Sequence, residues 1–159
     1  MGFSNPRRRN QRGLTLVELI VSFTIMLVLS TMAVPLARYK IRRDREIALR
    51  EALKEMRTAI DKYKDDADAG KLGQLKLDTY GYPESLDVLV DGVKMAGTVD
   101  TKKRYLRRIP KDPFTNTREW GKRSMQDDPT STSWGGQNLF DVYTTTMEKA
   151  RDGTPYSEW

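Results

Sequence analysis

The fold is decided by the stretch Gly13-Leu14-Thr15-Leu16-Val17-Glu18, after which the chain stays predominantly apolar as far as Ala37. Glu18 is the only ionisable side chain in residues 14–37. A helix rises about 1.5 Å per residue, so a helix over this segment would be about 36 Å long and would cross the ~30 Å apolar core of a bilayer. The sequence therefore predicts a transmembrane helix over residues 14–37.

The residues before this segment set its orientation. Four arginines precede it with no acidic residue among them: Arg7, Arg8, Arg9 and Arg12. The positive-inside rule then places the N-terminus in the cytoplasm and the rest of the chain outside. A secretory signal peptide has a shorter apolar core, of about 7–15 residues, and the sequence near Ser30 and Ala33 makes a poor cleavage site for one.

A carboxylate inside a membrane segment is costly and indicates a function, although a position close to the helix end would lower its cost. Glu18 is the fifth residue after Gly13. A glycine, an apolar residue and a glutamate at the fifth position together resemble the processing motif of the type IV pilin and pseudopilin superfamily. That family usually has Phe after the glycine, where this chain has Leu14. The resemblance implies that a prepilin peptidase cuts between Gly13 and Leu14, removes residues 1–13 as a leader and methylates the new amine.

Glu18 and Pro35 are the expected assembly residues. In a filament of packed helices, the Glu18 carboxylate would neutralise the Leu14 amine of a neighbouring subunit and so select one axial register, because an unpaired charge there is expensive. Pro35 removes a helix hydrogen bond and should kink or loosen the helix. It is either a tolerated membrane proline or, as the resemblance implies, the place where the helix extends during assembly.

Residues 38–64 continue the helix in amphipathic form. Apolar residues recur there at three- and four-residue steps: Leu49, Ala52, Leu53, Met56, Ala59, Ile60 and Tyr63. The charged residues 42–46 are expected to form a solvated collar at the bilayer surface or salt bridges between subunits. The aspartates of residues 65–68 and Gly70 should end the helix at Lys64 in a solvated turn, which is a simpler interpretation than a metal site.

Residues 65–159 are expected to form one extracytoplasmic globular domain. The sequence predicts a short helix over residues 82–90 with Pro83 early in it, and a loop over residues 91–103 with a brief strand near residues 93–95. It also predicts strands over residues 119–125 and 138–144. The expected fold is therefore α+β, with a long N-terminal helical rod packed against a small C-terminal antiparallel sheet with loops. The segment from Pro110 to Trp120 is similar to the start of the β-region in G-type, or major, pseudopilins of type II secretion systems.

Composition limits the possible functions. The chain has 159 residues and a net charge of +6, but removing the four leader arginines leaves 24 basic against 22 acidic residues, which gives little support to nucleic-acid binding. It contains no cysteine and no histidine, which excludes thiol and Ser-His chemistry. We expect no enzymatic activity.

The resemblance to G-type pseudopilins also implies a structural calcium ion. Asp152 and, second, Glu148 are the candidate ligands, with carbonyl and hydroxyl oxygens of residues 144–148. The simpler interpretation is that Asp152 and Gly153 form only a turn.

These observations predict a structural subunit of a type II secretion pseudopilus that drives protein secretion across the outer membrane. Its expected partners are other copies of itself, the prepilin peptidase, the inner-membrane assembly platform and minor pseudopilins. We expect a single-pass inner-membrane protein with its C-terminal domain in the periplasm. Two alternatives remain open. A type IV pilus pilin often has a disulfide that this chain lacks, and a monomeric signal-anchored binding domain leaves the spacing of Gly13 and Glu18 unexplained.

Overall fold

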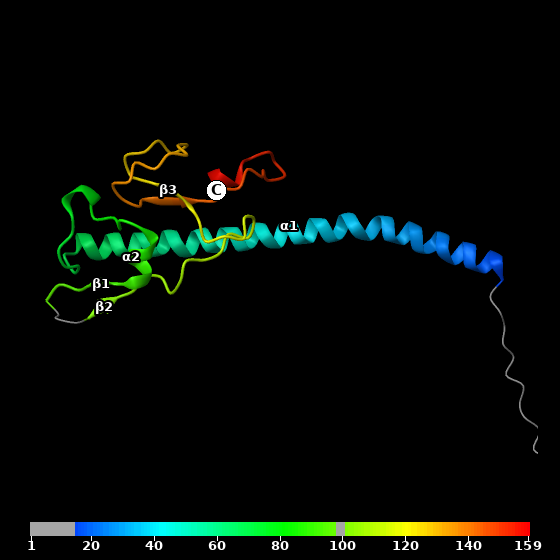
Figure 1. Ribbon diagram of the computed structural model, residues 1–159, viewed down its shortest axis with the longest axis horizontal. Helices are drawn as coiled ribbons and strands as arrows, with labels where there is room; N and C mark the ends of the chain where they lie inside the picture. Colours follow the sequence, from blue (N-terminus) through cyan, green and yellow to red (C-terminus); the bar gives the residue numbers. More distant parts are fainter. Residues whose placement is uncertain (1–14, 98–100) are drawn as a thin grey trace, which may run out of the picture. The chain divides into compact units, whose positions relative to one another are not determined.

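The computed structural model describes residues 15–97 and 101–159. The chain divides into two compact units, Met1–Arg42 and Arg43–Trp159, and the boundary falls inside the long helix α1 (Leu16–Asp68). The remaining elements all belong to the second unit (Figure 1). They are η1 (Leu77–Thr79), α2 (Leu86–Asp91), β1 (Val93–Lys94), β2 (Lys102–Lys103), β3 (Gly121–Arg123), β4 (Asp141–Tyr143) and η2 (Tyr156–Glu158).

Thr15 begins α1. Its hydroxyl oxygen accepts the backbone N–H of Glu18 at 3.3 Å. Thr15-Leu16-Val17-Glu18 has the spacing of a capping box, in which a threonine at the helix start is followed three residues later by a glutamate. The predicted first residue of the helix, Leu14, lies outside the described residues.

The helix ends four residues beyond the predicted Lys64. Residues 65–68 are helical, so the predicted solvated turn is wrong for them. The helix closes at Gly70, as expected, where the backbone has φ +65°. The N–H of Lys71 donates to the carbonyl of Asp66 at 2.9 Å and that of Gly70 donates to Ala67 at 3.0 Å, the two bonds of a Schellman motif. The predicted end was too early because Asp66 has partners far along the chain, Lys103 and Tyr105, which the local sequence does not show.

The predicted apolar face of α1 forms the core of the second unit. All seven of its residues are buried, and Leu49, Met56 and Ile60 are completely so. They pack with residues from the rest of the unit: Leu72, Leu86, Leu89, Leu106, Trp120, Leu139, Val142 and Tyr156. The three- and four-residue spacing in the sequence therefore predicted this face correctly.

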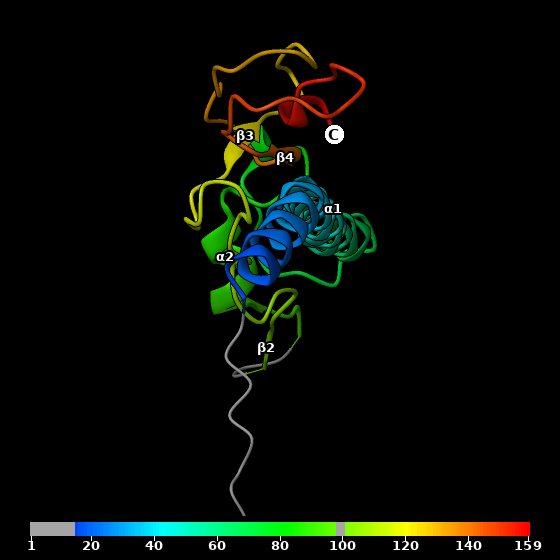
Figure 2. The same cartoon turned by 90° about the vertical axis from the view of Figure 1, so that its right-hand side faces the viewer.

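Two small antiparallel sheets accompany the helix. β3 pairs with β4, with Lys122 opposite Val142, which confirms the two predicted strands in shortened form. β1 pairs with β2, and β2 was not expected. In both views the β3–β4 pair and the β1–β2 pair lie on opposite sides of the second half of α1 (Figures 1 and 2). The α+β prediction is confirmed.

The predicted helix over residues 82–90 is displaced. α2 begins at Leu86, after Ser85, whose backbone is extended. Pro83 therefore lies before the helix and not early in it, and its carbonyl accepts the N–H of Leu139 at 2.7 Å. Leu86 and Leu89 are buried as expected.

Candidate functional site

In the first unit, the described part of α1 exposes its large apolar side chains. From Leu16 to Ile41 their exposed fractions lie between 51% (Val21) and 73% (Leu16). By length and composition this helix is able to cross a membrane, and its most apolar 18-residue stretch has a mean hydropathy of 2.3. A continuous apolar surface of this extent marks a membrane or protein contact.

Glu18 lies in the first turn of α1 and is acidic where the N-terminal end of the helix dipole favours a negative charge. Its backbone N–H is bound by Thr15, a residue whose role the sequence analysis missed. The Thr-x-x-Glu spacing was the signal that would have found it. The predicted processing residues, Gly13 and Leu14, lie outside the described residues, so cleavage and methylation stay predictions.

Pro35 lies inside α1, with helical residues on both sides. It has no N–H to donate to the carbonyl of Thr31, four residues earlier. The Thr31 hydroxyl donates to the carbonyl of Val28 at 2.7 Å. The expected loosening of the helix at this point stays a prediction.

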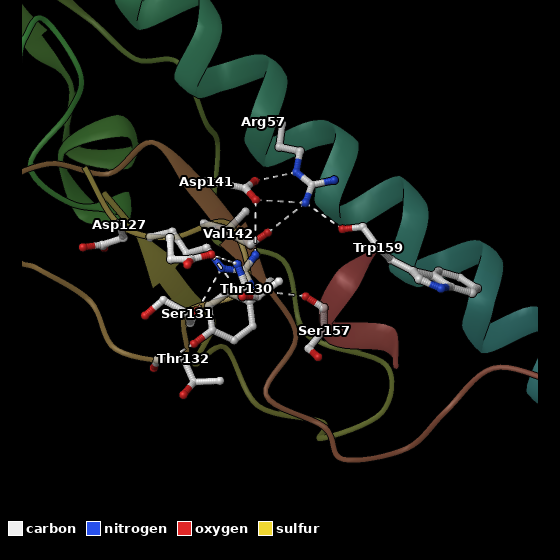
Figure 3. A network of polar contacts seen from close by, with 12 residues as sticks. Arg57, Asp127, Thr130, Ser131, Thr132, Asp141, Val142, Ser157 and Trp159 are labelled. Atoms are coloured by element: carbon white, nitrogen blue, oxygen red, sulfur yellow. Dashed lines mark hydrogen bonds and ion pairs between the residues drawn. The ribbon is translucent and has the colours of Figure 1, made fainter. Parts of the chain in front are cut away.

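In the second unit, Arg57 of α1 binds β4 and the C-terminal residue at once (Figure 3). Its Nε donates to Asp141 Oδ1 at 2.7 Å and its Nη2 to Asp141 Oδ2 at 3.3 Å. The same Nη2 donates to the carbonyls of Val142 at 3.2 Å and Trp159 at 2.7 Å. Such a two-pronged contact between arginine and a carboxylate fixes orientation as well as adding energy. Arg57 therefore holds three separate segments together.

Arg123 of β3 extends this network. Its Nε donates to the carbonyl of Ser131 at 3.0 Å and its Nη2 to that of Ser157 at 3.3 Å. The guanidinium lies 4.1 Å from the centre of the Tyr143 ring and 3.6 Å from Asp141 Oδ2. Arg57 and Arg123 thus hold irregular segments that have few regular hydrogen bonds of their own.

The C-terminal segment is fixed to α1 at two further points. The Tyr156 hydroxyl donates to Glu46 Oε1 at 2.7 Å, and the Tyr156 ring is fully buried. The guanidinium of Arg50 lies 4.2 Å from the centre of the Trp159 ring, a cation–π contact. The C-terminal segment with Tyr156 and Trp159 is therefore attached to the helix.

Asp66, near the end of α1, is the centre of a second polar cluster. It binds the Lys103 ammonium and accepts the Tyr105 hydroxyl at 2.8 Å, and Lys71 Nζ lies 3.5 Å away. The hydrogen bonds from Lys103 and Tyr105 lower the pKa of Asp66. Burial and the neighbouring Asp66 raise the pKa of Tyr105. This cluster connects α1 to β2 and the segment after it.

Asp112 is the centre of a third group of polar contacts, after those of Arg57 and Asp66. The sequence analysis did not single it out. Its carboxylate is completely buried, binds the Thr144 hydroxyl and accepts the N–H of Phe114 at 2.8 Å. It therefore joins the turn after Pro110 to the segment that follows β4.

The predicted calcium ligands lie in the C-terminal loop, and both are exposed. Asp152 Oδ1 accepts the N–H of Thr154 at 3.0 Å, a bond that lowers the pKa of Asp152, and the Glu148 carbonyl accepts the N–H of Tyr156 at 3.3 Å. Within residues 15–97 and 101–159, no three or more His, Cys, Asp or Glu side chains form a group able to hold a metal ion. Calcium takes six to eight oxygens, so these side chains alone do not make a calcium site.

Comparison with known proteins decides the family. The prokaryotic N-terminal methylation motif matches residues 8–34. Type II secretion system core protein G of Klebsiella michiganensis is 31% identical over 114 residues, which cover 68% of this chain and 71% of that protein. The chain belongs to the family of type II secretion system core protein G.

A second core protein G, from Pseudomonas aeruginosa, is 28% identical over 117 residues, covering 69% of this chain and 72% of that protein. No solved structure matches the chain significantly. The resemblance to G-type pseudopilins is therefore confirmed. Family membership and the apolar part of α1 together indicate a membrane-anchored subunit with a pilin-like role.

Proposed function

We propose that this core protein G family member is the structural subunit of a type II secretion pseudopilus. A prepilin peptidase cleaves it after Gly13 and methylates Leu14, and the mature chains then assemble through the N-terminal part of α1. The main observation in support of this proposal is the position of Glu18. This glutamate is the only ionisable residue of the described stretch 15–37, and it lies in the first turn of a helix whose apolar side chains are exposed.

The physical basis is charge pairing in an apolar surrounding. Cleavage leaves an α-amine on Leu14, and a filament of side-by-side helices excludes water from it. An unpaired charge there costs several kcal/mol, whereas a carboxylate from the adjacent copy neutralises it. Only one axial offset between two helices brings Glu18 of one copy to Leu14 of the next, so the pair selects the register of each added subunit.

The proposed location follows from the four leader arginines. They retain the N-terminus in the cytoplasm, so the unit Arg43–Trp159 lies in the periplasm and α1 crosses the inner membrane before assembly. The partners in this proposal are further copies of the chain, the prepilin peptidase, minor pseudopilins and the inner-membrane assembly platform. The proposal assigns no catalytic residue.

Calcium binding is a separate proposal that rests on the resemblance to G-type pseudopilins. Asp152 and Glu148 would hold the ion, which would stabilise the C-terminal loop of a unit that has no disulfide. Since the two carboxylates supply only part of a calcium coordination shell, backbone carbonyls, hydroxyls and water would supply the rest.

The assembly proposal is tested by replacing Glu18 with Ala in cells that express the complete secretion system, and by measuring the amount of the chain in sheared, sedimented filaments. Thr15→Ala is the matched control, because it removes the helix cap and leaves the carboxylate. We expect Glu18→Ala to be processed but absent from filaments, and Thr15→Ala to assemble. Equal assembly by both variants and the unaltered chain would refute the proposed pairing.

A further inference from the structure

Five cations follow directly after the apolar stretch of α1. They form a basic belt, which consists of Arg38, Lys40, Arg42, Arg43 and Arg45, and all five are exposed. The preceding residues 19–37 contain no ionisable side chain. The basic belt therefore begins where the stretch that is able to cross a membrane ends.

The helix distributes these cations around its whole circumference. α1 is unbroken through this stretch, and successive residues of an α-helix are about 100° apart. Arg38, Arg42 and Arg45 are therefore on one side of the helix, whereas Lys40 and Arg43 are on the opposite side. A helix that contacts protein on one side carries its contact residues in a stripe. Cations on both sides fit a surrounding that is alike all round the helix, which a lipid bilayer provides.

The position of the belt along the helix fits the headgroup layer of a bilayer. Residues 16–37 are about 33 Å long as a helix, slightly more than the ~30 Å hydrocarbon core. The belt extends over about 10 Å beyond them, and the headgroup layer on each side of the core is about 5–8 Å thick. Long basic side chains reach back toward the membrane surface, which brings Arg45 into range. Tyr39, which is 52% exposed, lies within the belt, and tyrosine is enriched at membrane interfaces.

The nearby carboxylates are too few to neutralise the belt. Residues 38–46 contain two of them, Asp44 and Glu46, against the five cations. Glu46 also accepts the hydroxyl of Tyr156 at 2.7 Å. Within the described part of the chain, the belt cations other than Arg42 form no ion pair. The same stretch of a second copy has the same excess of positive charge, so it cannot neutralise the belt either.

The type of cation favours a phosphate as the partner. Four of the five belt residues are arginines. A guanidinium donates two parallel hydrogen bonds to phosphate oxygens, whereas a lysine ammonium acts as a point charge. At the level of the headgroups, phosphates belong to phospholipids. A zwitterionic lipid neutralises its phosphate with its own amine, so an anionic lipid is the better match to a belt with excess positive charge.

We propose that the basic belt binds the headgroups of anionic phospholipids in the leaflet from which α1 emerges. The lipid phosphates accept hydrogen bonds from the guanidinium groups, and their net negative charge neutralises the excess charge of residues 38–46. The inference rests on the proposed function for its orientation, which places the belt at the periplasmic surface of the inner membrane.

The belt has a particular importance after the proposed cleavage. The four leader arginines are removed with residues 1–13, and residues 14–37 contain no basic side chain. The processed chain therefore has its first basic side chain at Arg38. Processing moves the positive charge that flanks the apolar stretch from the cytoplasmic end to the outer end. Lipids bound to the belt then retain the processed subunit at the outer surface until assembly withdraws it.

The test measures lipid selectivity in vesicles that contain the full-length chain. The chain is reconstituted into phosphatidylcholine vesicles with a trace of spin-labelled phosphatidylglycerol or of spin-labelled phosphatidylcholine. Electron spin resonance then gives the fraction of each label that is immobilised against the protein. We expect phosphatidylglycerol to be preferred by about fivefold at low salt. Equal association of the two lipids would overturn the proposal and favour charge pairing between subunits as the role of the belt.

Two variants assign the preference to the belt. The belt variant combines Arg38→Gln, Lys40→Gln, Arg43→Gln and Arg45→Gln, and it should reduce the preference to less than about twofold. The matched control removes the same charge from exposed residues of the second unit and should keep the full preference. It combines Lys102→Gln, Arg104→Gln, Arg107→Gln and Arg108→Gln. The immobilised fraction of labelled phosphatidylcholine shows that each variant is inserted. An equal loss in both variants would indicate general attraction to a basic protein and overturn the assignment.

Ionic strength provides a second readout on the unaltered chain. The Debye length falls from about 30 Å at 0.01 M salt to about 3 Å at 1 M, so the preference should decrease over this range. A preference that does not decrease would contradict charge as its cause. Inorganic phosphate should act no more strongly than sodium chloride of equal ionic strength. A stronger effect of phosphate would assign the belt to a soluble anion and overturn the choice of lipid.

These measurements separate the inference from the proposed function, because they need neither the peptidase nor a filament. A chain without lipid preference overturns the inference and leaves the proposed function intact. If instead the chain is not processed and forms no filament, the proposed function fails. The lipid preference then still stands as measured, and only the assignment of the belt to the periplasmic leaflet falls.

Discussion

Arg57 and Asp141 are 84 residues apart in the sequence and form a two-pronged contact, with Nε to Oδ1 at 2.7 Å and Nη2 to Oδ2 at 3.3 Å. One residue comes from α1 and the other from β4, so this contact fixes the small sheet to the helix that carries the apolar segment. The guanidinium also holds the carbonyl of Trp159. Arg57 is therefore one of the α1 residues that fix the C-terminal segment to the helix.

We expect Arg57→Met to lower the free energy of unfolding of the second unit by about 1–3 kcal/mol, because it removes charge-assisted hydrogen bonds and leaves Asp141 with a weaker partner. The measurement is denaturant unfolding of the full chain in detergent, followed by tryptophan fluorescence, since all three tryptophans lie in this unit. Asp141→Asn and the double variant complete the cycle. Additive effects of the two single changes would show that the contact contributes nothing.

The core prediction compares two isoleucines of α1. Ile60 is completely buried, whereas Ile47 is 48% exposed. Ile60→Ala should cost about 2–5 kcal/mol through lost burial and a residual cavity, and Ile47→Ala should cost well under half of that. Denaturant unfolding of the two variants, as above, measures the loss of stability in each. A similar loss for both would mean that the buried face is assigned incorrectly.

The buried position of Ile60 and the exposed position of Ile47 illustrate which features can be predicted from the sequence alone. The buried face of α1 repeats at a helical period, so it was predictable residue by residue from a single segment. Glu18 was singled out because it is a lone carboxylate in an apolar run, and its role in assembly stays a prediction. Both signals are local, and both involve residues close together in the chain.

The missed features depend on distant parts of the chain. Asp66 was expected in a solvated turn, but its partners Lys103 and Tyr105 are 37 and 39 residues away. β2 consists of two exposed lysines with no alternation of apolar residues, and it forms because the backbone of β1 accepts a partner there. Pairing across such distances leaves no periodic pattern in the sequence.

Asp66 gives the protein an acid-sensitive contribution to stability. Its pKa in the folded chain is lowered, first by the hydrogen bond from Lys103, so its contribution is complete above the unfolded pKa of about 3.9 and is lost as the pH falls through the folded value. The stability difference between the unaltered chain and Asp66→Asn should therefore be largest at neutral pH and shrink below about pH 4. Denaturant unfolding of the unaltered chain and of Asp66→Asn across this pH range measures the difference.

The neighbouring exposed Asp65 is the control. Asp65→Asn should change stability little at any pH, because its side chain forms no ion pair with the described residues. A difference for Asp66→Asn that stays constant from pH 7 to pH 3 would contradict the proposed role of its charge.

The calcium proposal predicts a rise in the melting temperature of the second unit when calcium replaces a chelator. Asp152→Asn should abolish that rise, and Glu148→Gln should reduce it. Asp87→Asn, an exposed change outside the C-terminal loop, should leave it unaltered. An equal melting temperature with calcium and with chelator would reject the calcium site.

The most direct test of the central claim is the intact mass of the full chain purified from membranes, with and without a co-expressed prepilin peptidase. We expect that the peptidase removes residues 1–13 and that Leu14 then carries one additional methyl group. An unprocessed chain under both conditions would contradict it.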